Sequence, residues 1–278
     1  MSTKIEWTDR TWNPLAGCSQ VSEGCRNCYA MGQAHRFDGQ SVGYDGTTKR
    51  VGGRTVLRKQ RHLPDGIMGE RKTVGARTVW TGQVNLLYER LREPLHWRKP
   101  CRVFVNSMSD LFHEEVPDSY IDSVFATMEQ AHWHQYQVLT KRSQRMRDYV
   151  TARYKGAAAP AHIWLGVSAE DQATFNARVH NLRRTPAIVQ LVSLEPLLET
   201  VQTQVWTLRG FNWVIVGAES GPGARPMHPD WARMVRDYCK AAGVAFFMKQ
   251  LSGPGGHAVK DMALFPDDLR IREYPQAQ

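Results

Sequence analysis

Three of the five cysteines lie close together in the sequence, as Cys18, Cys25 and Cys28, with the spacing C-x6-C-x2-C. Three thiolates are one ligand short of the closed four-cysteine site that a structural metal ion often uses. An iron–sulfur cluster bound by three cysteines leaves one iron free for a ligand from outside the chain, and catalysis needs such an open position. The three cysteines therefore predict an iron–sulfur cluster with one open iron.

A structural zinc site is the alternative interpretation of the same stretch. His35 follows Cys28 with the spacing C-x6-H, so a Cys3His zinc site can be drawn. Zinc motifs usually contain two close pairs of ligands, and only Cys25 and Cys28 form a close pair here. Cys101 and Cys239 stand alone and are expected to be small buried residues. An odd number of cysteines, three of them clustered, argues against a disulfide framework.

Short apolar runs alternate with helical patterns after Trp80, and these elements would position the site. The expected strands are the runs 102–106, 135–140, 162–167, 187–193, 212–217 and 244–249. The expected helices are 29–37, 117–132 with Asp118 as its cap, 172–182 and 230–242. One or two further strands are expected near Trp12 and in 79–84. Apolar strands that alternate with helices indicate an α/β fold with a parallel sheet, closed as a full or partial (β/α) barrel; an open doubly wound sheet is the alternative.

We expect one domain over residues 1–278, because a single α/β barrel commonly has this length. Its parts are a cysteine cluster loop in 1–37, a basic insertion in 38–78, βα repeats in 79–251 and a C-terminal strap in 252–278. Apolar residues make up 42% of the chain, which excludes general disorder. The sequence contains no apolar run long enough to span a membrane, and its first residues lack an apolar signal core. We therefore expect a cytoplasmic protein with no membrane partner.

The net charge of +9 is concentrated in one window of the sequence. Residues 46–77 contain nine Lys or Arg against Asp65 and Glu70, a net charge of +7. Such a stretch is the usual electrostatic footprint of a phosphate-rich partner, although a solvated loop, with a short helix in 56–62, also fits. Trp80, Tyr88 and Trp97 flank it and could stack on bases. A nucleic acid or nucleotide is therefore the expected partner.

Polar residues follow each of the expected strands, where the reactive groups of parallel barrels lie. These strand-end segments are 106–110, 140–142, 168–170, 193–196, 217–221 and 249–250. Ordinary helix caps would explain Ser168 or Ser193, but they explain charged groups less well. We therefore predict a binding site for a polar ligand at this rim. Its candidates for substrate or phosphate binding are Lys141, Arg142 and Lys249, which could equally form salt bridges.

Several motifs, in order along the chain, resemble those of a family of uncharacterised phage and bacterial proteins described as radical-SAM-like with a three-cysteine motif. They are IEWTD at 5–9, TWNP at 11–14, the cysteine loop at 17–29, VFVNSMSDLFH at 103–113, LTKR at 139–142, SLEPL at 193–197 and FFMKQ at 246–250. The resemblance extends from Ile5 to about Pro275 and is weakest in 46–77. It is specific for the family, whose reaction is not settled.

The resemblance implies a barrel of the radical SAM type, with a [4Fe-4S] cluster on the three cysteines and S-adenosylmethionine on the fourth iron. It also implies an electron donor. The residues it suggests for cofactor binding are Ser107, Asp110, Ser168, Glu195 and Glu219. The cysteine spacing departs from the common C-x3-C-x2-C, and Asn27 replaces the usual aromatic before the third cysteine. Cluster binding tolerates this departure more easily than cleavage of S-adenosylmethionine.

We therefore predict a radical S-adenosylmethionine enzyme that acts on a nucleic acid or nucleotide. A non-catalytic nucleic-acid-binding protein with a structural Cys3His zinc site is the alternative; it predicts that removing the metal unfolds the chain. A barrel hydrolase that uses Glu195 and Glu219 as paired carboxylates ranks last, because it leaves the cysteines unexplained.

Overall fold

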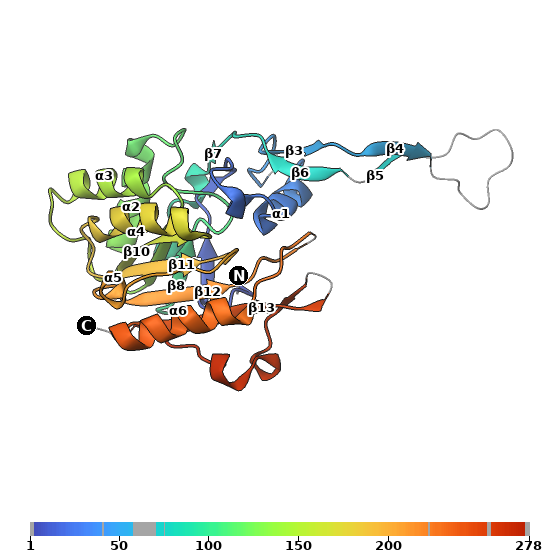
Figure 1. The fold of residues 1–278 in the computed structure, drawn as a ribbon. Helices are drawn as coiled ribbons and strands as arrows, with labels where there is room; N and C mark the ends of the chain where they lie inside the picture. Colours follow the sequence, from blue (N-terminus) through green and yellow to red (C-terminus); the bar gives the residue numbers. More distant parts are fainter. Residues whose placement is uncertain are drawn as a thin grey trace, which may run out of the picture.

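The computed structural model describes residues 3–40, 42–57, 71–74, 76–221, 223–254 and 257–275, and it is built around one curled, eight-stranded sheet (Figure 1). The strands of this sheet, in spatial order, are β1 (Arg10–Trp12), β8 (Arg102–Val105), β9 (Gln135–Thr140), β10 (Ile163–Ala169), β11 (Gln190–Leu194), β12 (Trp213–Gly217), β13 (Ala245–Ser252) and β14 (Ala258–Val259). Neighbouring strands are parallel except β14, which is antiparallel to β13. Within the described residues the sheet is a half-barrel, so the partial form of the predicted barrel is the one found.

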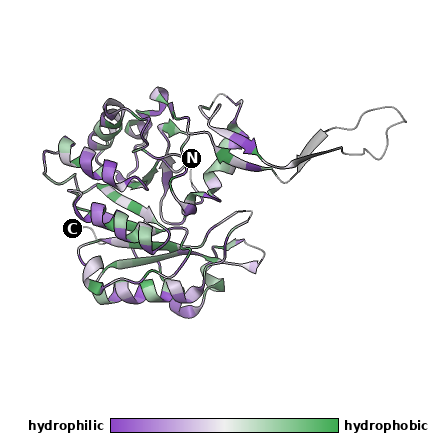
Figure 2. Ribbon diagram, turned by 45° about the horizontal axis from the view of Figure 1, so that its top comes forward, coloured by the Kyte–Doolittle hydropathy of each residue, from purple (hydrophilic) through white to green (hydrophobic). Residues whose placement is uncertain are grey.

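The strand order follows the chain without reversal, and this excludes the doubly wound alternative, in which the order reverses at a switch point. The helices are α1 (Tyr29–Phe37), α2 (Asp118–Gln130), α3 (Ser143–Arg153), α4 (Gln172–Arg183), α5 (Val205–Leu208) and α6 (Pro229–Ala242). Helix α4 packs on β10 and α6 on β13. In Figure 2 the strands are largely apolar, whereas the helices carry many hydrophilic residues. None of the described helices is long and apolar enough to cross a membrane.

The main strands and helices agree with the sequence predictions, and two local differences have clear causes. Helix α3 was not predicted, because only Met146, Tyr149 and Val150 give it a buried apolar side amid charged residues. The cap predicted for α2 is wrong. Pro117 occupies the N-cap position without a side-chain cap, and Asp118 instead pairs with Arg145 at 2.9 Å.

The basic insertion forms antiparallel ladders that project from the body as an arm (Figure 1). Strand β3 (Thr48–Val51) pairs with β6 (Arg77–Trp80), and β4 (Arg54–Leu57) pairs with β5 (Arg71–Val74). The strand predicted in 79–84 is therefore part of this arm and not of the main sheet. The helix predicted in 56–62 is wrong at its first two residues, which lie in β4; residues 58–62 lie outside the described part of the chain.

Shorter elements complete the fold. They are the antiparallel strands β2 (Leu15–Ala16) and β7 (Asn85–Leu86) and the 3-10 turns η1 (Glu23–Cys25), η2 (Tyr88–Arg90), η3 (Glu93–His96), η5 (Met262–Leu264) and η6 (Asp267–Leu269). The chain after β14 returns along β13, where the Met248 N–H donates to the Ile271 carbonyl at 2.9 Å. The chain after β14 therefore packs along the last parallel strand of the sheet.

Aromatic side chains fill the inside of the half-barrel at the amino ends of its strands. Trp7, Trp164, Trp213 and Phe247 form a buried cluster there, and Tyr274 of the C-terminal segment packs against it. The cluster residues are buried at this end of the half-barrel. Space for a ligand lies toward the other end, where the parallel strands finish.

Candidate functional site

A cavity of about 340 Å³ lies at the carboxyl ends of the parallel strands and contains the predicted site residues. All three clustered cysteines line it, and so does each of the other predicted residues: Ser107, Asp110, Lys141, Arg142, Ser168, Glu195, Glu219 and Lys249. Its volume lies in the range of small-molecule sites, about 300 to 1,000 Å³. The fold therefore brings together residues that the sequence spreads over more than two hundred positions.

The side chains inside the half-barrel change from apolar to polar as the strands approach the cavity. On β10, Trp164 belongs to the buried aromatic cluster, and Ser168 further along lines the cavity. On β11, Leu191 is followed in the same way by Ser193, which is paired with Ser168 in the sheet. Both serines therefore lie within strands and cap no helix; Asp171 caps α4 instead.

The thiols of the cysteine loop are buried in a way that disfavours free thiolates. Burial raises the pKa of the Cys18 thiol to about 12, with Asp110 adding to the rise and Arg142 opposing it. Burial also raises the pKa of Cys28, although the amide N–H of Ala30, at the start of α1, favours its thiolate. Both thiols are therefore protonated at neutral pH unless a metal binds them, and metal binding would release protons.

Three cysteine sulfurs are the kind of ligand that binds an iron–sulfur cluster, but in this structure they are not close enough together to coordinate a metal ion. The charges of Cys25 and Cys28 both raise the pKa of Cys18, which shows that the three are near neighbours. Within the described ranges, however, no three His, Cys, Asp or Glu side chains are close enough together to hold a metal ion. His35, the fourth ligand of the zinc hypothesis, lies on α1 with Nδ1 3.3 Å from Thr48 Oγ1 and does not line the cavity.

Arg142, at the end of β9, binds the beginning of the cysteine loop. Its Nη2 donates to Ser19 Oγ at 2.6 Å, and its Nη1 lies 4.0 Å from Cys18 Sγ. The same guanidinium pairs with Asp110 at 3.0 Å and with Glu114 at 2.9 Å. Because its donors already have partners in the chain, the geometry favours a positioning role for Arg142. Phosphate binding by this residue stays a prediction.

Asp110 connects the segment after β8 to the end of β9. Its Oδ1 accepts hydrogen bonds from Thr140 Oγ1 at 2.7 Å and from the Phe112 N–H at 3.0 Å, while Oδ2 pairs with Arg142. Ser107, also predicted to bind a cofactor, donates to Asn13 at 3.1 Å. Both residues line the cavity with polar atoms that bond within the chain, and their role toward a cofactor stays a prediction.

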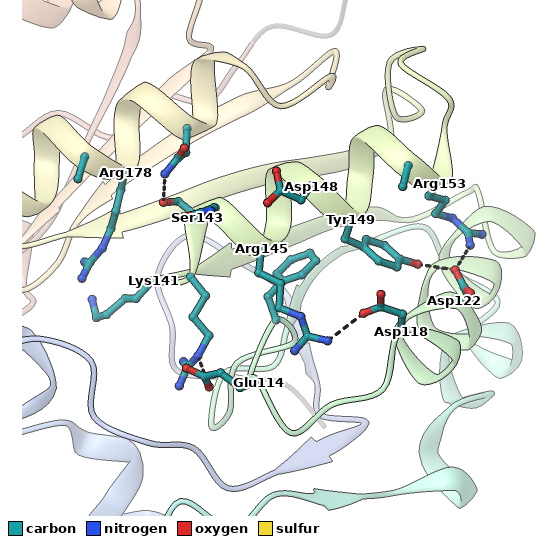
Figure 3. Close-up of a pocket in the computed structure, with 16 residues that line it drawn as sticks. Glu114, Asp118, Asp122, Lys141, Ser143, Arg145, Asp148, Tyr149, Arg153 and Arg178 are labelled. Atoms are coloured by element: carbon teal, nitrogen blue, oxygen red, sulfur yellow. Dashed lines mark hydrogen bonds and ion pairs between the residues drawn. The ribbon is translucent and has the colours of Figure 1, made fainter.

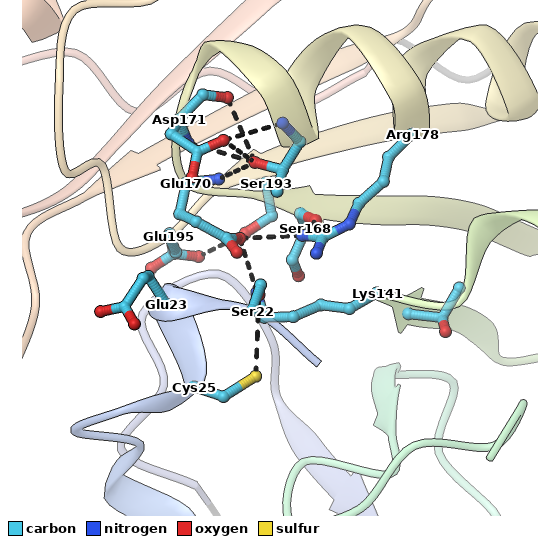
Figure 4. A network of polar contacts seen from close by, with 12 residues as sticks. Ser22, Glu23, Cys25, Lys141, Ser168, Glu170, Asp171, Arg178, Ser193 and Glu195 are labelled. Carbon is cyan, nitrogen blue, oxygen red and sulfur yellow. Dashed lines mark hydrogen bonds and ion pairs between the residues drawn. The ribbon is translucent and has the colours of Figure 1, made fainter. Parts of the chain in front are cut away.

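Glu170, the residue after β10, is buried against the cysteine loop (Figure 4). Its Oε2 lies 2.8 Å from Arg178 Nη1 and 3.4 Å from Lys141 Nζ. Burial opposes ionisation of Glu170, but the charges of Lys141 and Arg178 outweigh it and hold the pKa below its usual 4.5. Gly24 packs directly on this carboxyl group, because a Cβ at position 24 would lie 2.8 Å from Glu170 Cδ. Glu170 thus supports the cysteine loop with a charged group. The sequence analysis identified it only as one of several polar residues that follow the strands.

Glu219, after β12, holds the opposite side of the cysteine loop. Its Oε2 accepts from Asn27 Nδ2 at 2.9 Å, and both of its oxygens bind Arg225. Arg225 in turn donates to the Glu23 carbonyl at 2.8 Å. Burial raises the pKa of Glu219, but the hydrogen bonds from Arg225 and Asn27 outweigh burial, so the pKa lies below 4.5. Asn27 therefore attaches the loop to the sheet.

Glu195 and Lys249 form an ion pair at the cavity wall. Lys249 Nζ lies 2.7 Å from Glu195 Oε1, and Ser193 Oγ donates to Glu195 Oε2 at 3.0 Å. The carboxylate fits only because position 217 is glycine, since a Cβ there would lie 2.7 Å from Glu195 Oε1. Glu195 and Glu219 are each held by a different cation, which does not favour the hydrolase hypothesis.

Asn106, the residue after β8, has a carboxamide without a hydrogen-bond partner in the described part of the chain. Its side chain lines the cavity and is 3% exposed, yet neither Nδ2 nor Oδ1 has a hydrogen-bond partner among the described residues. Leaving a buried polar group unpaired costs about 1–3 kcal/mol. Its backbone is also unusual, with φ of 61°, a left-handed conformation that asparagine adopts more easily than most residues. Sequence reasoning placed Asn106 at the rim but gave it no role.

A second, larger hollow of about 870 Å³ lies between α2, α3 and α4 (Figure 3). Its charged groups are largely paired with one another: Arg153 binds Asp122 at 2.7 Å and Arg145 binds Asp118 at 2.9 Å. Tyr149 also donates to Asp122 at 2.7 Å. These contacts join the helices, and we place the candidate site in the smaller cavity.

The residues expected to contact nucleic acid are divided between the arm and the body. Lys49, Arg50 and Arg77 are exposed on the described part of the arm. Of the three aromatic residues, Trp80 is buried and lines the cavity, whereas Tyr88 is exposed. Trp97 lies beneath Arg10, with the guanidinium 5.0 Å from the ring centre. For the remaining basic residues in 54–75, the side chain or the whole residue lies outside the part of the chain that the structure describes.

Residues 2–265 match the model of a family described as a protein of unknown function, DUF5131. Because the match covers most of the chain, the chain belongs to this family. No curated protein and no solved structure matches it. The family description carries no activity, so the resemblance to radical-SAM-like proteins stays a prediction.

Proposed function

We propose that this protein is a radical S-adenosylmethionine-type enzyme in which Cys18, Cys25 and Cys28 hold a [4Fe-4S] cluster. The observation that carries the proposal is that all three thiols line the same cavity as the polar strand-end residues. A purely structural metal does not need a ligand cavity beside it, whereas a catalytic metal does. The zinc alternative is less well supported, because His35 lies away from this cavity.

A cluster with an open iron, once reduced by an electron donor, supplies radical chemistry through bound S-adenosylmethionine. The chain's own residues would position and shield that chemistry. Arg142 places a positive charge beside Cys18, which favours its thiolate. Lys249 and Glu195 pair with each other at the cavity wall, so a ligand that carries both an amino and a carboxylate group would bind them by exchanging partners with this ion pair. Trp7 and Phe104 line the cavity with apolar surface that excludes water.

A nucleic acid or nucleotide is the substrate that the charge distribution favours. The arm carries exposed Lys49, Arg50 and Arg77 within a window of net charge +7, and it projects from the body that contains the cavity (Figure 1). A basic arm of this kind would bind phosphates without reading sequence. The chemistry would then take place on the part of the substrate that reaches the cavity.

The test is the metal content of protein purified without oxygen. We expect about four irons and matching sulfide per chain, and a reduced-state EPR spectrum that changes when S-adenosylmethionine is added. Replacing Cys18, Cys25 or Cys28 singly by Ser should abolish iron binding. Cys101→Ser, at a cysteine outside the cavity, is the matched control and should keep the iron. Zinc at one per chain, without iron after reconstitution, would contradict the proposal.

A further inference from the structure

The unpaired carboxamide of Asn106 is the feature of the cavity that the proposed function leaves unexplained. Its backbone is fully engaged: the Asn106 N–H donates to the Trp12 carbonyl at 2.8 Å, and its carbonyl accepts from the Ser109 N–H at 3.4 Å. Only the side chain lacks hydrogen-bond partners among the residues that the structure describes, although it is buried and lines the cavity.

The turn after β8 does not by itself account for this side chain. A residue with φ of 61° is needed there to turn the chain out of the strand, and glycine adopts such a conformation at no steric cost. Asparagine is tolerated in this conformation, but it also adds one acceptor and two donor hydrogens to a buried wall. A ligand that satisfies both kinds of atom would explain why a carboxamide is suited to this position.

The surroundings of Asn106 define the ligand group further. Phe104, two residues earlier on β8, lines the same cavity, as do Trp7 and Leu139. The Trp7 and Phe104 rings lie 4.6 Å apart and form an aromatic wall. A flat, uncharged ring with a donor and an acceptor on one edge would match both the carboxamide and this wall.

We propose that Asn106 reads the N6/N7 edge of an adenine base, with Oδ1 accepting from the N6 amino group and Nδ2 donating to N7. This pairing is the geometry in which asparagine recognises adenine. The inference rests on the proposed function in placing a nucleoside in this cavity, but it needs no iron. The base belongs either to S-adenosylmethionine or to a nucleotide substrate, and Asn106 is a binding residue in both cases.

The test measures nucleoside binding to the full chain by equilibrium dialysis with adenosine, inosine and 7-deazaadenosine. Inosine replaces the N6 donor with an acceptor, and 7-deazaadenosine lacks N7, so each should bind about tenfold or more weakly than adenosine. Equal binding of either analogue, or no binding of adenosine, would overturn the inference. Because the assay requires no cluster, adenosine selectivity in a chain that holds no iron would sustain this inference while the proposed enzyme function fails.

Two variants of the same position separate the hydrogen bonds from the turn. Asn106→Gly keeps the left-handed backbone accessible and should bind the three nucleosides within about twofold of one another. Asn106→Asp keeps an acceptor for N6 but loses the donor to N7, so it should still prefer adenosine to inosine and no longer distinguish 7-deazaadenosine. Undiminished selectivity in Asn106→Gly, with the fold verified by thermal unfolding, would show that another group reads the base.

Competition identifies the source of the base. S-adenosylhomocysteine carries the same adenine, so mutually exclusive binding with adenosine assigns the Asn106 contact to the cofactor. If S-adenosylhomocysteine and adenosine bind at the same time, and Asn106→Gly still loses selectivity for adenosine, the Asn106 contact belongs to the substrate. Both results support adenine recognition. Adenine recognition by Asn106 is contradicted if every Asn106 variant still binds S-adenosylhomocysteine and the unmodified chain binds the three nucleosides equally well.

Discussion

The guanidinium of Arg142 lies 4.0 Å from the sulfur of Cys18, although 124 positions separate the two residues in the chain. Arg142 occupies the N-cap position of α3, two residues after the last residue of β9, so the end of a central strand sets the position of the cysteine loop. The same pattern recurs at Glu170 and Glu219, whose carboxyl groups contact the loop at Gly24 and Asn27. Much of the polar rim is therefore a support for the cysteines, and a smaller part of it faces a ligand.

Replacing Arg142 should loosen the cysteine loop. Arg142→Lys keeps the charge but cannot reproduce the hydrogen bonds to Ser19, Asp110 and Glu114 from a single nitrogen. We expect a loss of about 1–3 kcal/mol in the free energy of unfolding, measured in urea, and less iron per chain after reconstitution. Arg184→Lys, at an exposed arginine, is the control. Unchanged stability and iron content would show that Arg142 does not hold the loop.

The contact between Gly24 and Glu170 can be tested without removing any charge. In Gly24→Ala the new Cβ would lie 2.8 Å from Glu170 Cδ, so either the cysteine loop moves or the Glu170 carboxylate shifts away from Lys141 and Arg178. We expect a destabilisation of about 1–3 kcal/mol together with reduced iron binding.

Gly32→Ala is a matched control on α1, where a Cβ meets no atom within 4 Å. Alanine is the better helix former, so this variant should gain about 0.5–1 kcal/mol and keep its iron. Equal behaviour of the two variants in thermal unfolding and iron analysis would rule out the proposed contact.

Stability should fall in acid partly through Glu219. Its pKa is below 4.5 in the folded chain and near 4.5 in the unfolded chain, so the unfolded state binds the proton more readily. The stabilisation from the Arg225 and Asn27 contacts is therefore complete above about pH 5 and is lost as the pH falls through the folded pKa.

Glu219→Gln removes this titration, so its free energy of unfolding should vary less with pH than that of the unmodified chain between about pH 5 and 3. At neutral pH we expect the variant to be about 1–3 kcal/mol less stable, because Arg225 loses a charged partner. Urea unfolding of metal-free protein at several pH values measures both effects. Parallel curves for the two proteins would be inconsistent with a depressed pKa at Glu219.

The basic arm should bind nucleic acid through phosphates. The triple variant Lys49→Ala, Arg50→Ala, Arg77→Ala should weaken binding of single-stranded and duplex oligonucleotides of any sequence. It should also reduce the slope of log K against log salt by up to about 2–3, since each phosphate contact contributes close to one unit.

A control with the same loss of charge combines Arg184→Ala, Arg209→Ala and Lys240→Ala, which are exposed and lie away from the arm. Fluorescence anisotropy at several salt concentrations compares the two triple variants. Equal loss of affinity in both would mean that net charge, and not the arm, drives the binding.

The sequence by itself determined the elements and the composition of the site. Apolar runs of strand length fixed β8 to β13 within a few residues, and the polar residues that follow them proved to line one cavity, because parallel strands end on the same side of a sheet. The spacing of Cys18, Cys25 and Cys28 identified the thiols of that cavity without any knowledge of the fold.

Only the tertiary structure decided what each polar group does. The pairs Arg142–Cys18 and Asn27–Glu219 join residues 124 and 192 positions apart, and nothing in the local sequence of either partner specifies the other. That the Asn106 carboxamide has no hydrogen-bond partner among the described residues is likewise a property of its surroundings. Local periodicity reports which face a residue occupies, whereas hydrogen bonds and ion pairs depend on distances that exist only once the strands have packed side by side.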